Sequence, residues 1–282
     1  MTTIGIASGK GGTGKTTVAV ALALARENVQ LLDCDVEAPN AHLFLNPELD
    51  RTETVYTPVP GIDTDRCTLC GACAEICRYK AIAVLPETIL SFPELCHGCG
   101  GCMAVCPEGA ISEAGRELGV VESGTRGDLR FVHGRLRIGE AMAPPLIRKV
   151  RERALPDRTV IIDAPPGTSC PVIAAIRGTD VVVLVTEPTP FGQNDLELAA
   201  SAVQTLGIPC GIVVNRSDIG DGRVRDYAER EGIPILLEIP FERAIAAAYA
   251  EGIPLVDVHP DFPEKFRSLF DRIDELAKGG AR

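Results

Sequence analysis

The cysteines are the residues with the clearest chemical potential, because most of them are gathered in one part of the chain. Eight of the eleven lie between Cys67 and Cys106. They form two runs with the same spacing, C-x₂-C-x₂-C-x₃-C, whose first members, Cys67 and Cys96, are 29 residues apart. Repeated short spacings of this kind indicate thiolate ligands of a metal centre rather than disulfides.

Each run has the spacing found in bacterial two-cluster ferredoxins, in which the fourth cysteine of a run binds the cluster of the other run. The sequence therefore predicts two [4Fe–4S] clusters held by crossed sets of ligands. The first set is Cys67, Cys70, Cys73 and Cys106, and the second is Cys96, Cys99, Cys102 and Cys77. Zinc is the main alternative, but its cysteine pairs are usually separated by longer gaps.

The two runs differ at the residue that follows the fourth cysteine. Pro107 follows Cys106, as the pattern expects, whereas Arg78 follows Cys77. Proline fixes the turn but supplies no ligand, so we expect both clusters to be retained. A nearby guanidinium would raise the potential of one of them.

A second constellation lies near the N-terminus, where residues 9–16 satisfy G-x-x-x-x-G-K-[ST]. The glycines let the backbone N–H groups turn toward phosphate oxygens, and the following helix adds a partial positive charge. Lys15 is expected to contact the β- and γ-phosphates, and the Thr16 hydroxyl to bind Mg²⁺. The predicted nucleotide-binding residues here are Gly9, Lys10, Gly11, Gly12, Thr13, Gly14, Lys15, Thr16 and Thr17.

The additional lysine, Lys10, makes this loop resemble the K-G-G-x-G-K-[ST] variant of the MinD/ParA/Mrp group of P-loop ATPases. This resemblance implies ATP as the nucleotide and a homodimer that encloses it. Lys10 would then reach the partner's phosphates, in a role analogous to that of an arginine finger. The alternative is an exposed lysine that neutralises the nucleotide of its own subunit.

The resemblance extends to aspartates that follow two apolar strands. In Asp33-Cys34-Asp35, Asp35 would orient the attacking water and Asp33 would support Mg²⁺. In the segment Asp163–Gly167, Asp163 would hold Mg²⁺ through water. The implied catalytic residues are Lys10, Lys15, Asp35 and Asp163.

Weaker matches concern the base of the nucleotide. Asn215 resembles the family's adenine-reading asparagine, and Pro240-Phe241 resembles the segment that closes over the base. Each of these segments could equally be an ordinary junction between a strand and a turn.

Helix and strand signals alternate on both sides of the cysteine-rich stretch. Strands are expected at Thr3–Ala7, Val29–Asp33, Val160–Asp163, Val181–Thr186, Gly211–Asn215 and Ile235–Ile239, and helices at 15–26, 195–206, 224–231, 242–250 and 263–277. Strands separated by helices predict an α/β P-loop fold with a mostly parallel sheet.

The cysteine-rich stretch interrupts this alternation without ending it. Residues 117–138, around Gly127 and Gly134, indicate a small β meander. We therefore expect a split ATPase domain, 1–56 and 117–282, and an inserted small α+β ferredoxin-like module at 57–116.

Composition narrows the classes of partner. The net charge of −11 argues against binding to nucleic acid or to an anionic membrane surface. There is no run of 18 apolar residues and no basic, apolar leader, so we expect a cytoplasmic protein. The apolar positions of 264–278 indicate a helix that packs in the core.

Three cysteines lie outside the two runs. Cys34 and Cys210 are predicted to pack in the core. Cys170 stands where the related nitrogenase iron protein has a cluster ligand, but a second such cysteine and a C-terminal CPxC motif are missing. We expect a packing or capping role for Cys170 and keep a bridging cluster as the alternative.

The residues support three functional hypotheses. The first is an ATPase whose nucleotide cycle controls electron transfer to an unidentified redox partner. The second is an iron–sulfur assembly or carrier factor like Mrp, and the third is a MinD/ParA-like positioning ATPase.

Overall fold

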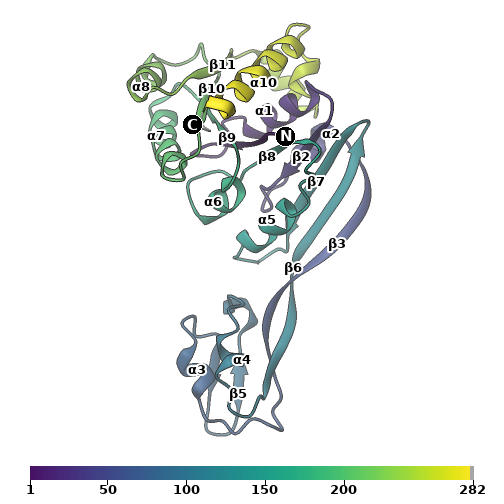
Figure 1. The fold of residues 1–282 in the computed structure, drawn as a ribbon, viewed down its shortest axis with the longest axis vertical. Helices are drawn as coiled ribbons and strands as arrows, with labels where there is room; N and C mark the ends of the chain where they lie inside the picture. Colours follow the sequence, from purple (N-terminus) through teal and green to yellow (C-terminus); the bar gives the residue numbers. More distant parts are fainter. Residues whose placement is uncertain (280–282) are drawn as a thin grey trace. The chain divides into compact units, whose positions relative to one another are not determined.

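The computed structural model describes residues 1–279 and divides the chain into two compact units. The first unit comprises Met1–Glu53, Val121–Arg135 and Ala143–Arg282, and the second comprises Thr54–Val120 and Leu136–Met142. Two long strands, β3 (Glu48–Ile62) and β6 (Ile111–Arg126), run from one unit into the other (Figure 1). The chain therefore enters the second unit along β3 and first leaves it along β6.

A largely parallel sheet forms the centre of the first unit. The strands follow the order β11-β10-β9-β1-β8-β2-β7-β6-β3. Their bounds are β1 (Thr3–Ala7), β2 (Val29–Asp33), β7 (Leu129–Leu136), β8 (Thr159–Asp163), β9 (Val181–Thr186), β10 (Cys210–Asn215) and β11 (Ile235–Ile239). All recorded pairings from β11 to β7 are parallel. The predicted mostly parallel α/β fold is thus confirmed.

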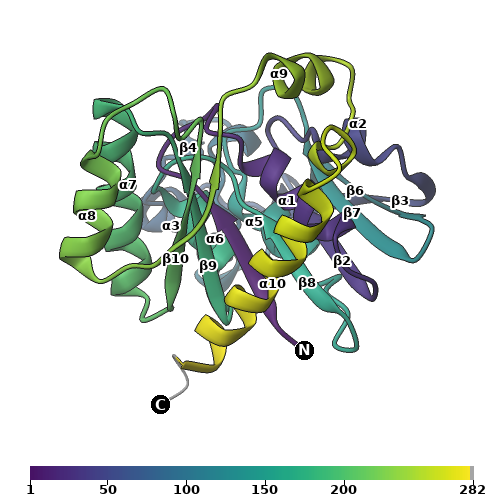
Figure 2. The same ribbon diagram turned by 90° about the horizontal axis from the view of Figure 1, so that it is seen from above.

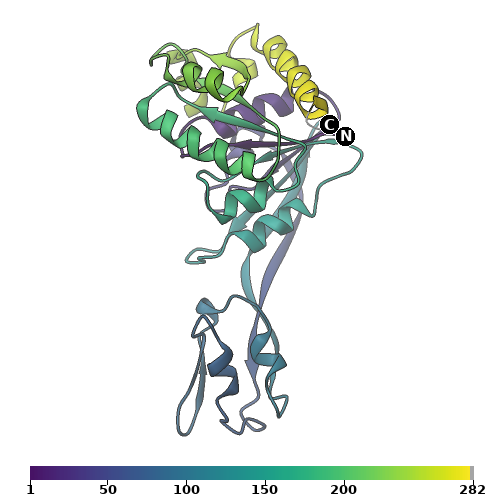
Figure 3. The same cartoon turned by 60° about the vertical axis from the view of Figure 1, so that its left-hand side comes forward.

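Helices cover both faces of this sheet (Figures 2 and 3). On one face, α1 (Lys15–Leu24) packs against α10 (Phe262–Gly279). On the other, α5 (Pro144–Arg151) packs against α6 (Cys170–Ile176). The remaining helices are α2 (Ala41–Leu45), α7 (Pro190–Thr205), α8 (Arg223–Glu231), α9 (Arg243–Ala250) and the short 3₁₀ turn η2 (Leu255–Asp257).

The prediction that 264–278 packs in the core is confirmed. Phe266, Leu269, Phe270 and Ile273 of α10 are buried in one cluster with α1 and alternate residues of the central strands. Strands covered on both faces are apolar at nearly every position, as β9 is from Val181 to Val185.

One local prediction was met in part, one strand was missed and one helix start was misplaced. Residues 117–138 form the neighbouring strands β6 and β7 on either side of Gly127, as the predicted meander requires, but these strands also extend the large sheet. Strand β3 was missed because Pro58 and Pro60 interrupt its pattern, and prolines are tolerated at the edge where β3 lies. Helix α7 begins at Pro190 rather than residue 195, because the Thr189 side chain caps it by accepting from Gly192 N–H.

The second unit contains short elements around the cysteine runs. These are α3 (Ala72–Ile76), the antiparallel pair β4 (Ile82–Val84) and β5 (Ile89–Ser91), the 3₁₀ turn η1 (Pro93–Leu95) and α4 (Gly101–Ala104). Cys73, Ile82, Ile89 and Ile111 form its small core.

The backbone of this unit repeats with the same 29-residue period as the cysteines. Left-handed residues occur in three matched pairs, Leu69 with Gly98, Gly71 with Gly100, and Lys80 with Gly109. Gly71 and Gly100 stand immediately before α3 and α4. The cysteine repeat is therefore also a repeat of turn geometry.

Segment 136–142 belongs to the second unit although its sequence carries no cysteine. The Arg137 N–H donates to the Leu118 carbonyl at 2.9 Å, and Arg116 forms an ion pair with the buried carboxylate of Glu140. No sequence motif predicts these contacts.

Candidate functional site

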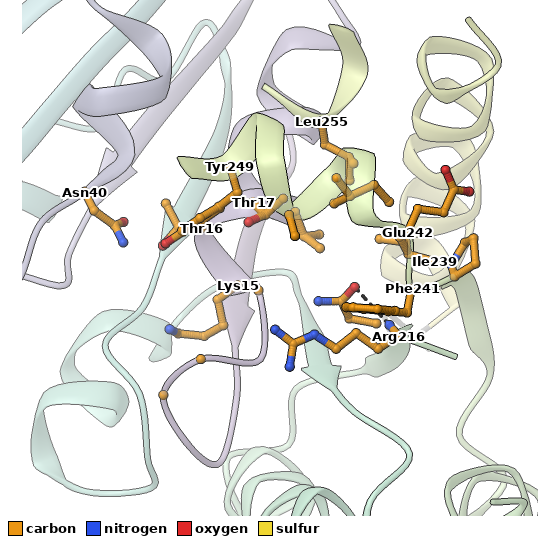
Figure 4. A pocket seen from close by; sticks show the side chains of 18 of the residues that line it. Lys15, Thr16, Thr17, Asn40, Arg216, Ile239, Phe241, Glu242, Tyr249 and Leu255 are labelled. Carbon is orange, nitrogen blue, oxygen red and sulfur yellow. Dashed lines mark hydrogen bonds between the residues drawn. The ribbon is translucent and has the colours of Figure 1, made fainter. Parts of the chain in front are cut away.

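A cavity of about 330 Å³ lies beside the glycine loop, where β1, β2 and β10 end. Lys15 and Arg216 lie on one side of it, with Tyr249 and Leu255 across from them (Figure 4). Of the predicted nucleotide-site residues, it is lined by Gly11, Gly12, Gly14, Lys15, Thr16, Thr17, Asp35, Asn215, Pro240 and Phe241.

The glycines of the loop are required by its backbone. Gly12 and Gly14 are left-handed, with φ of 80° and 93°. A Cβ atom on Gly14 would lie 2.5 Å from Asn215 Nδ2, which donates to the Thr13 carbonyl at 2.9 Å. The loop therefore packs directly against the end of β10, and α1 begins at its last turn with free N–H groups.

Thr16 and Asp163 form a buried polar contact at the start of α1. The Thr16 hydroxyl donates to Asp163 Oδ2 at 2.6 Å. Asp163 Oδ1 is buried and has no hydrogen-bond partner among the described residues. Burial raises the pKa of Asp163 to about 6, although Lys15 and the Thr16 hydroxyl oppose that rise. A hydroxyl beside an orphaned carboxylate oxygen fits a hard cation such as Mg²⁺.

Asp33 and Asp35 have different surroundings despite their proximity in sequence. The carboxylate of Asp33 accepts from the backbone N–H groups of Asp35, Asn40 and Ala41. Burial and repulsion from Asp163 raise the pKa of Asp33. Asp35 faces the cavity, and burial raises the pKa of its carboxyl against the opposing charge of Lys15.

Asp33 and Asp35 thus have different contacts, which bear differently on the roles that the resemblance implied for them. Asp35 lines the cavity, and its role toward the attacking water stays a prediction. The observed partners of Asp33 tie it to the start of α2, so its role toward Mg²⁺ stays a prediction.

The far side of the cavity is apolar and was largely missed from the sequence. Besides Pro240 and Phe241, it is lined by Ile245, Ala246, Tyr249 and Leu255 from α9 and η2. An apolar face suits a flat heterocyclic base. The alternation of small and apolar residues in α9 indicates a helix but not which face is turned to a ligand.

Lys10 lies outside the cavity lining and has a partner of its own. Its Nζ is 3.5 Å from Glu187 Oε1, and Glu187 Oε2 accepts from Arg216 Nη1 at 3.1 Å. Neither Glu187 nor its double contact was foreseen, because no nucleotide-binding motif includes it.

Two further cavities lie in the second unit, and each is lined by four cysteines. One is lined by Cys67, Cys70, Cys73 and Cys106, and the other by Cys96, Cys99, Cys102 and Cys77. The fold thus brings together the same two sets that the spacing grouped, including the exchange of the fourth cysteines.

The fourth cysteines occupy matching environments. The Ala81 N–H donates to Cys77 Sγ at 3.3 Å, and the Ala110 N–H donates to Cys106 Sγ at 3.2 Å. Each exchanged cysteine therefore has the same local contact, a backbone N–H group four residues further along the chain.

The donor set of each cavity, four thiols, is one that an iron–sulfur cluster can use. No group of three or more His, Cys, Asp or Glu within residues 1–279 is arranged to hold one metal ion. In a cubane, each thiolate binds a different iron, so the four sulfurs surround a larger space than they do around zinc. Four cysteines around a cavity agree with that arrangement.

The two cysteine cavities differ in their surroundings. The Tyr79 and His97 rings stack with centroids 3.5 Å apart beside the second cavity. Glu108 and Thr68, the residues at the repeat-related positions, line the first cavity. Two clusters bound here would have unequal environments.

The remaining cysteines are placed in two ways. Cys34 and Cys210 are buried, as predicted, and burial raises the pKa of Cys210 to about 11. Cys170 is exposed as the first residue of α6, which contradicts a packing role, while the capping role that was the other expectation stays a prediction.

Among residues 1–279, no helix combines the length and the apolar character needed to cross a membrane.

Comparison with known proteins relates most of the chain to one family. Residues 4–255 match the family described as the CobQ/CobB/MinD/ParA nucleotide binding domain. A similar protein is an uncharacterized one from Methanocaldococcus jannaschii, 30% identical over 97% of this chain and 96% of its own length. An iron-sulfur cluster carrier protein from Pyrococcus horikoshii is 26% identical over 99% of this chain and 89% of its own.

Solved structures share the fold. The septum site-determining protein MinD of Pyrococcus horikoshii, complexed with Mg-ADP, aligns with a TM-score of 0.60 at 20% identity. The alignment covers 100% of this chain and 99% of that one.

Proposed function

Because the chain belongs to the CobQ/CobB/MinD/ParA family of nucleotide-binding proteins, we propose that it is a dimeric ATP-hydrolysing switch that controls electron transfer through two [4Fe–4S] clusters. The observation that carries the second half of this proposal is the pair of cavities, each lined by one crossed set of four cysteines.

The nucleotide half of the proposal assigns roles to the residues around the larger cavity. Lys15 and the loop N–H groups hold the phosphates, while Thr16 and Asp163 hold Mg²⁺. Asp35 faces the phosphate region and orients the attacking water. Lys10 acts on the nucleotide of a second subunit. The Mg-ADP complex of the structurally similar MinD supports the choice of cofactors.

The cluster half rests on the cysteine geometry. Three cysteines of one run and the fourth of the other surround each cavity, and a backbone N–H group donates to the sulfur of each exchanged cysteine. A [4Fe–4S] cluster supplies one-electron transfer when bound. The exposed aromatic pair and Arg78 at one site, against Pro107 and Glu108 at the other, would give the two sites different potentials.

The covalent path between the two halves is short. Asp33 holds the first residues of α2, and β3 begins only three residues after α2 ends. Strand β3 then runs into the second unit, ending five residues before Cys67. Movement of the switch segment on nucleotide binding would therefore be passed directly along this strand.

The test of the cluster assignment uses two double variants of anaerobically purified protein. Wild type is expected to hold about eight irons and eight sulfides per chain. Cys67→Ala with Cys106→Ala removes two ligands of the same crossed set, so one cluster should keep its EPR signal unchanged. Cys67→Ala with Cys77→Ala takes one ligand from each set, so both signals should change.

The reverse outcome, with one signal preserved only in the second double variant, would show that the sets are not crossed. Metal without acid-labile sulfide would contradict iron–sulfur clusters altogether.

A second function, delivery of clusters to other proteins, is favoured by the similarity to proteins named iron-sulfur cluster carriers. The two are separated by mixing the loaded protein with an apo-ferredoxin. A carrier would lose iron to the acceptor in an ATP-sensitive manner, whereas an electron carrier would keep it.

A further inference from the structure

Glu187 is a buried carboxylate placed between two cations from different parts of the nucleotide site. It follows β9, and its side chain is only 10% exposed. One oxygen lies 3.5 Å from Lys10 Nζ on the glycine loop, and the other accepts from Arg216 Nη1 at 3.1 Å, after β10. A buried carboxylate of this kind requires partners, because an uncompensated charge is costly.

The backbone around Glu187 leaves little room for adjustment. A Cβ atom on Gly192 would lie 2.2 Å from the Glu187 carbonyl oxygen, and one on Gly220 would lie 1.7 Å from the Pro188 carbonyl oxygen. The Thr186 hydroxyl also donates to the Gly192 carbonyl at 2.9 Å. Glu187 is therefore held in place by its own turn.

The glycine loop is packed against the same turn and its helix. A Cβ atom on Gly9 would lie 2.0 Å from the Asp195 carbonyl oxygen in α7. The Ser8 hydroxyl donates to the Lys10 carbonyl at 2.6 Å. Lys10 is thus brought beside Glu187 by fixed backbone on both sides, not by a chance meeting of two mobile side chains.

Arg216 is likewise constrained. It has a left-handed backbone, with φ of 52°, and its N–H donates to Asn215 Oδ1 at 3.0 Å. Such a conformation is costly for a residue other than glycine and persists only where its surroundings hold it. With the backbone of Arg216 fixed in this way, its guanidinium reaches a different oxygen of Glu187 from the one near Lys10, so it can stay there when the other cation leaves.

We propose that Glu187 is a positioning residue that holds Lys10 within its own subunit and so opposes the engagement of Lys10 with a nucleotide in a second subunit. This inference rests on the proposed function, in which Lys10 acts across a dimer.

The unequal contacts of Glu187 make the exchange feasible. Both cations are partly exposed, Lys10 at 33% and Arg216 at 43%, but the Lys10 contact is the longer one, at 3.5 Å against 3.1 Å, and so the weaker. The phosphates of ATP offer Lys10 more negative charge than one shared carboxylate does. Arg216 continues to neutralise Glu187 after Lys10 departs, so no buried charge is left without a partner.

The test measures dimerisation against protein concentration by analytical ultracentrifugation, with Mg²⁺ and a non-hydrolysable ATP analogue. Glu187→Gln keeps the size of the side chain and removes its charge, so dimers should form at about fivefold lower concentration. With Lys10→Ala already present, the same substitution should have no effect, because the contact is then absent.

Glu197→Gln is the matched control, since Glu197 is a partly exposed glutamate of α7 that pairs with Arg230. It should leave dimerisation unchanged. Glu187→Asp provides a second variant if Glu187→Gln fails to fold. It retains a charge for Arg216 but is one methylene shorter toward Lys10, and should strengthen dimerisation less.

The outcomes separate this inference from the proposed function. Nucleotide-dependent wild-type dimers that neither Glu187 variant strengthens, or a strengthening that persists with Lys10→Ala, would overturn the positioning role alone. Absence of such dimers in wild type and variants alike would overturn the dimeric switch, and this inference with it.

Discussion

At the scale of single residues, the site is governed by burial of carboxylates close to one another. Asp163 is fully buried, bonded to Thr16 through one oxygen and free at the other within the described residues. Burial, with a smaller contribution from the nearby Asp35, raises the pKa of its carboxyl to about 6, although Lys15 and the Thr16 hydroxyl lower it. Asp163 therefore changes charge in a range where ordinary aspartates are already ionised.

This raised pKa predicts that Mg²⁺-dependent nucleotide binding weakens in acid. The cation needs the ionised carboxylate, so affinity for Mg·ATP should fall about tenfold from pH 7 to pH 5. Calorimetric titration at a series of pH values measures this, and Asp163→Asn should bind weakly at every pH with a much flatter profile. A wild-type affinity independent of pH over that range would contradict the assignment.

The raised pKa of Asp163 affects the stability of the fold in the opposite direction from nucleotide binding. Without cation, the folded state binds the Asp163 proton more tightly than the unfolded state does, because its folded pKa is about 6 against 3.8. The contribution of this residue to stability is therefore greatest in acid and is lost as the pH rises from about 4 through 6.

Residues with a local signature could be predicted, and residues defined by tertiary contact could not. Lys15, Thr16 and the eight clustered cysteines stand in motifs whose spacing reflects the ligand. Glu187 meets Lys10 only because β9 lies beside β1 in the sheet. The position of Glu187 beside Lys10 could not be predicted before the strand order was known.

At the scale of elements, the glycine loop depends on close backbone packing as well as on ligand geometry. Gly9 is pressed against the Asp195 carbonyl of α7, whereas no atom of residues 1–279 lies within 4 Å of a Cβ placed on Gly11. Packing thus closes the Gly9 position to a side chain, whereas the Gly11 position is open.

This difference predicts unequal effects of the same substitution on stability. Gly9→Ala should lower the free energy of unfolding of the first unit by about 3 kcal/mol, because backbone must move to admit the methyl group. Gly11→Ala should change it by less than ~1 kcal/mol. Thermal unfolding without nucleotide checks this, and equal melting temperatures for the two variants would refute it.

Helices and strands were predicted well where the hydrophobic pattern of the segment itself defines them. They were predicted poorly where they depend on pairing with residues far away in the sequence. Strands β9 and β11 were placed to the residue because they are apolar or sharply bounded. Strand β3 and segment 136–142 were missed, since their structure depends on partners in β6 and on the ion pair between Arg116 and Glu140.

At the scale of the whole molecule, the chain links a nucleotide-binding unit to a cysteine-rich unit through two strands. Strand β3 leads from α2 toward Cys67, and β6 returns from the turn after Cys106. Strand β3 thus continues from a segment beside the nucleotide cavity, and β6 continues from a segment beside a cysteine cavity. Spacing and composition predicted the presence of both sites, whereas the connecting strands emerged only from the structure.

The most direct test of the account is the midpoint potential of the clusters in wild-type protein with Mg·ATP and with Mg·ADP, measured by EPR-monitored redox titration. The midpoint potential of at least one cluster is expected to differ by about 60 mV between the two nucleotides, which is a tenfold change in a one-electron equilibrium. In the Asp35→Ala variant, the potential should stay at the value measured with Mg·ATP, because this variant cannot hydrolyse the nucleotide. Two clusters whose potentials are the same with either nucleotide would contradict the coupling of ATP to electron transfer.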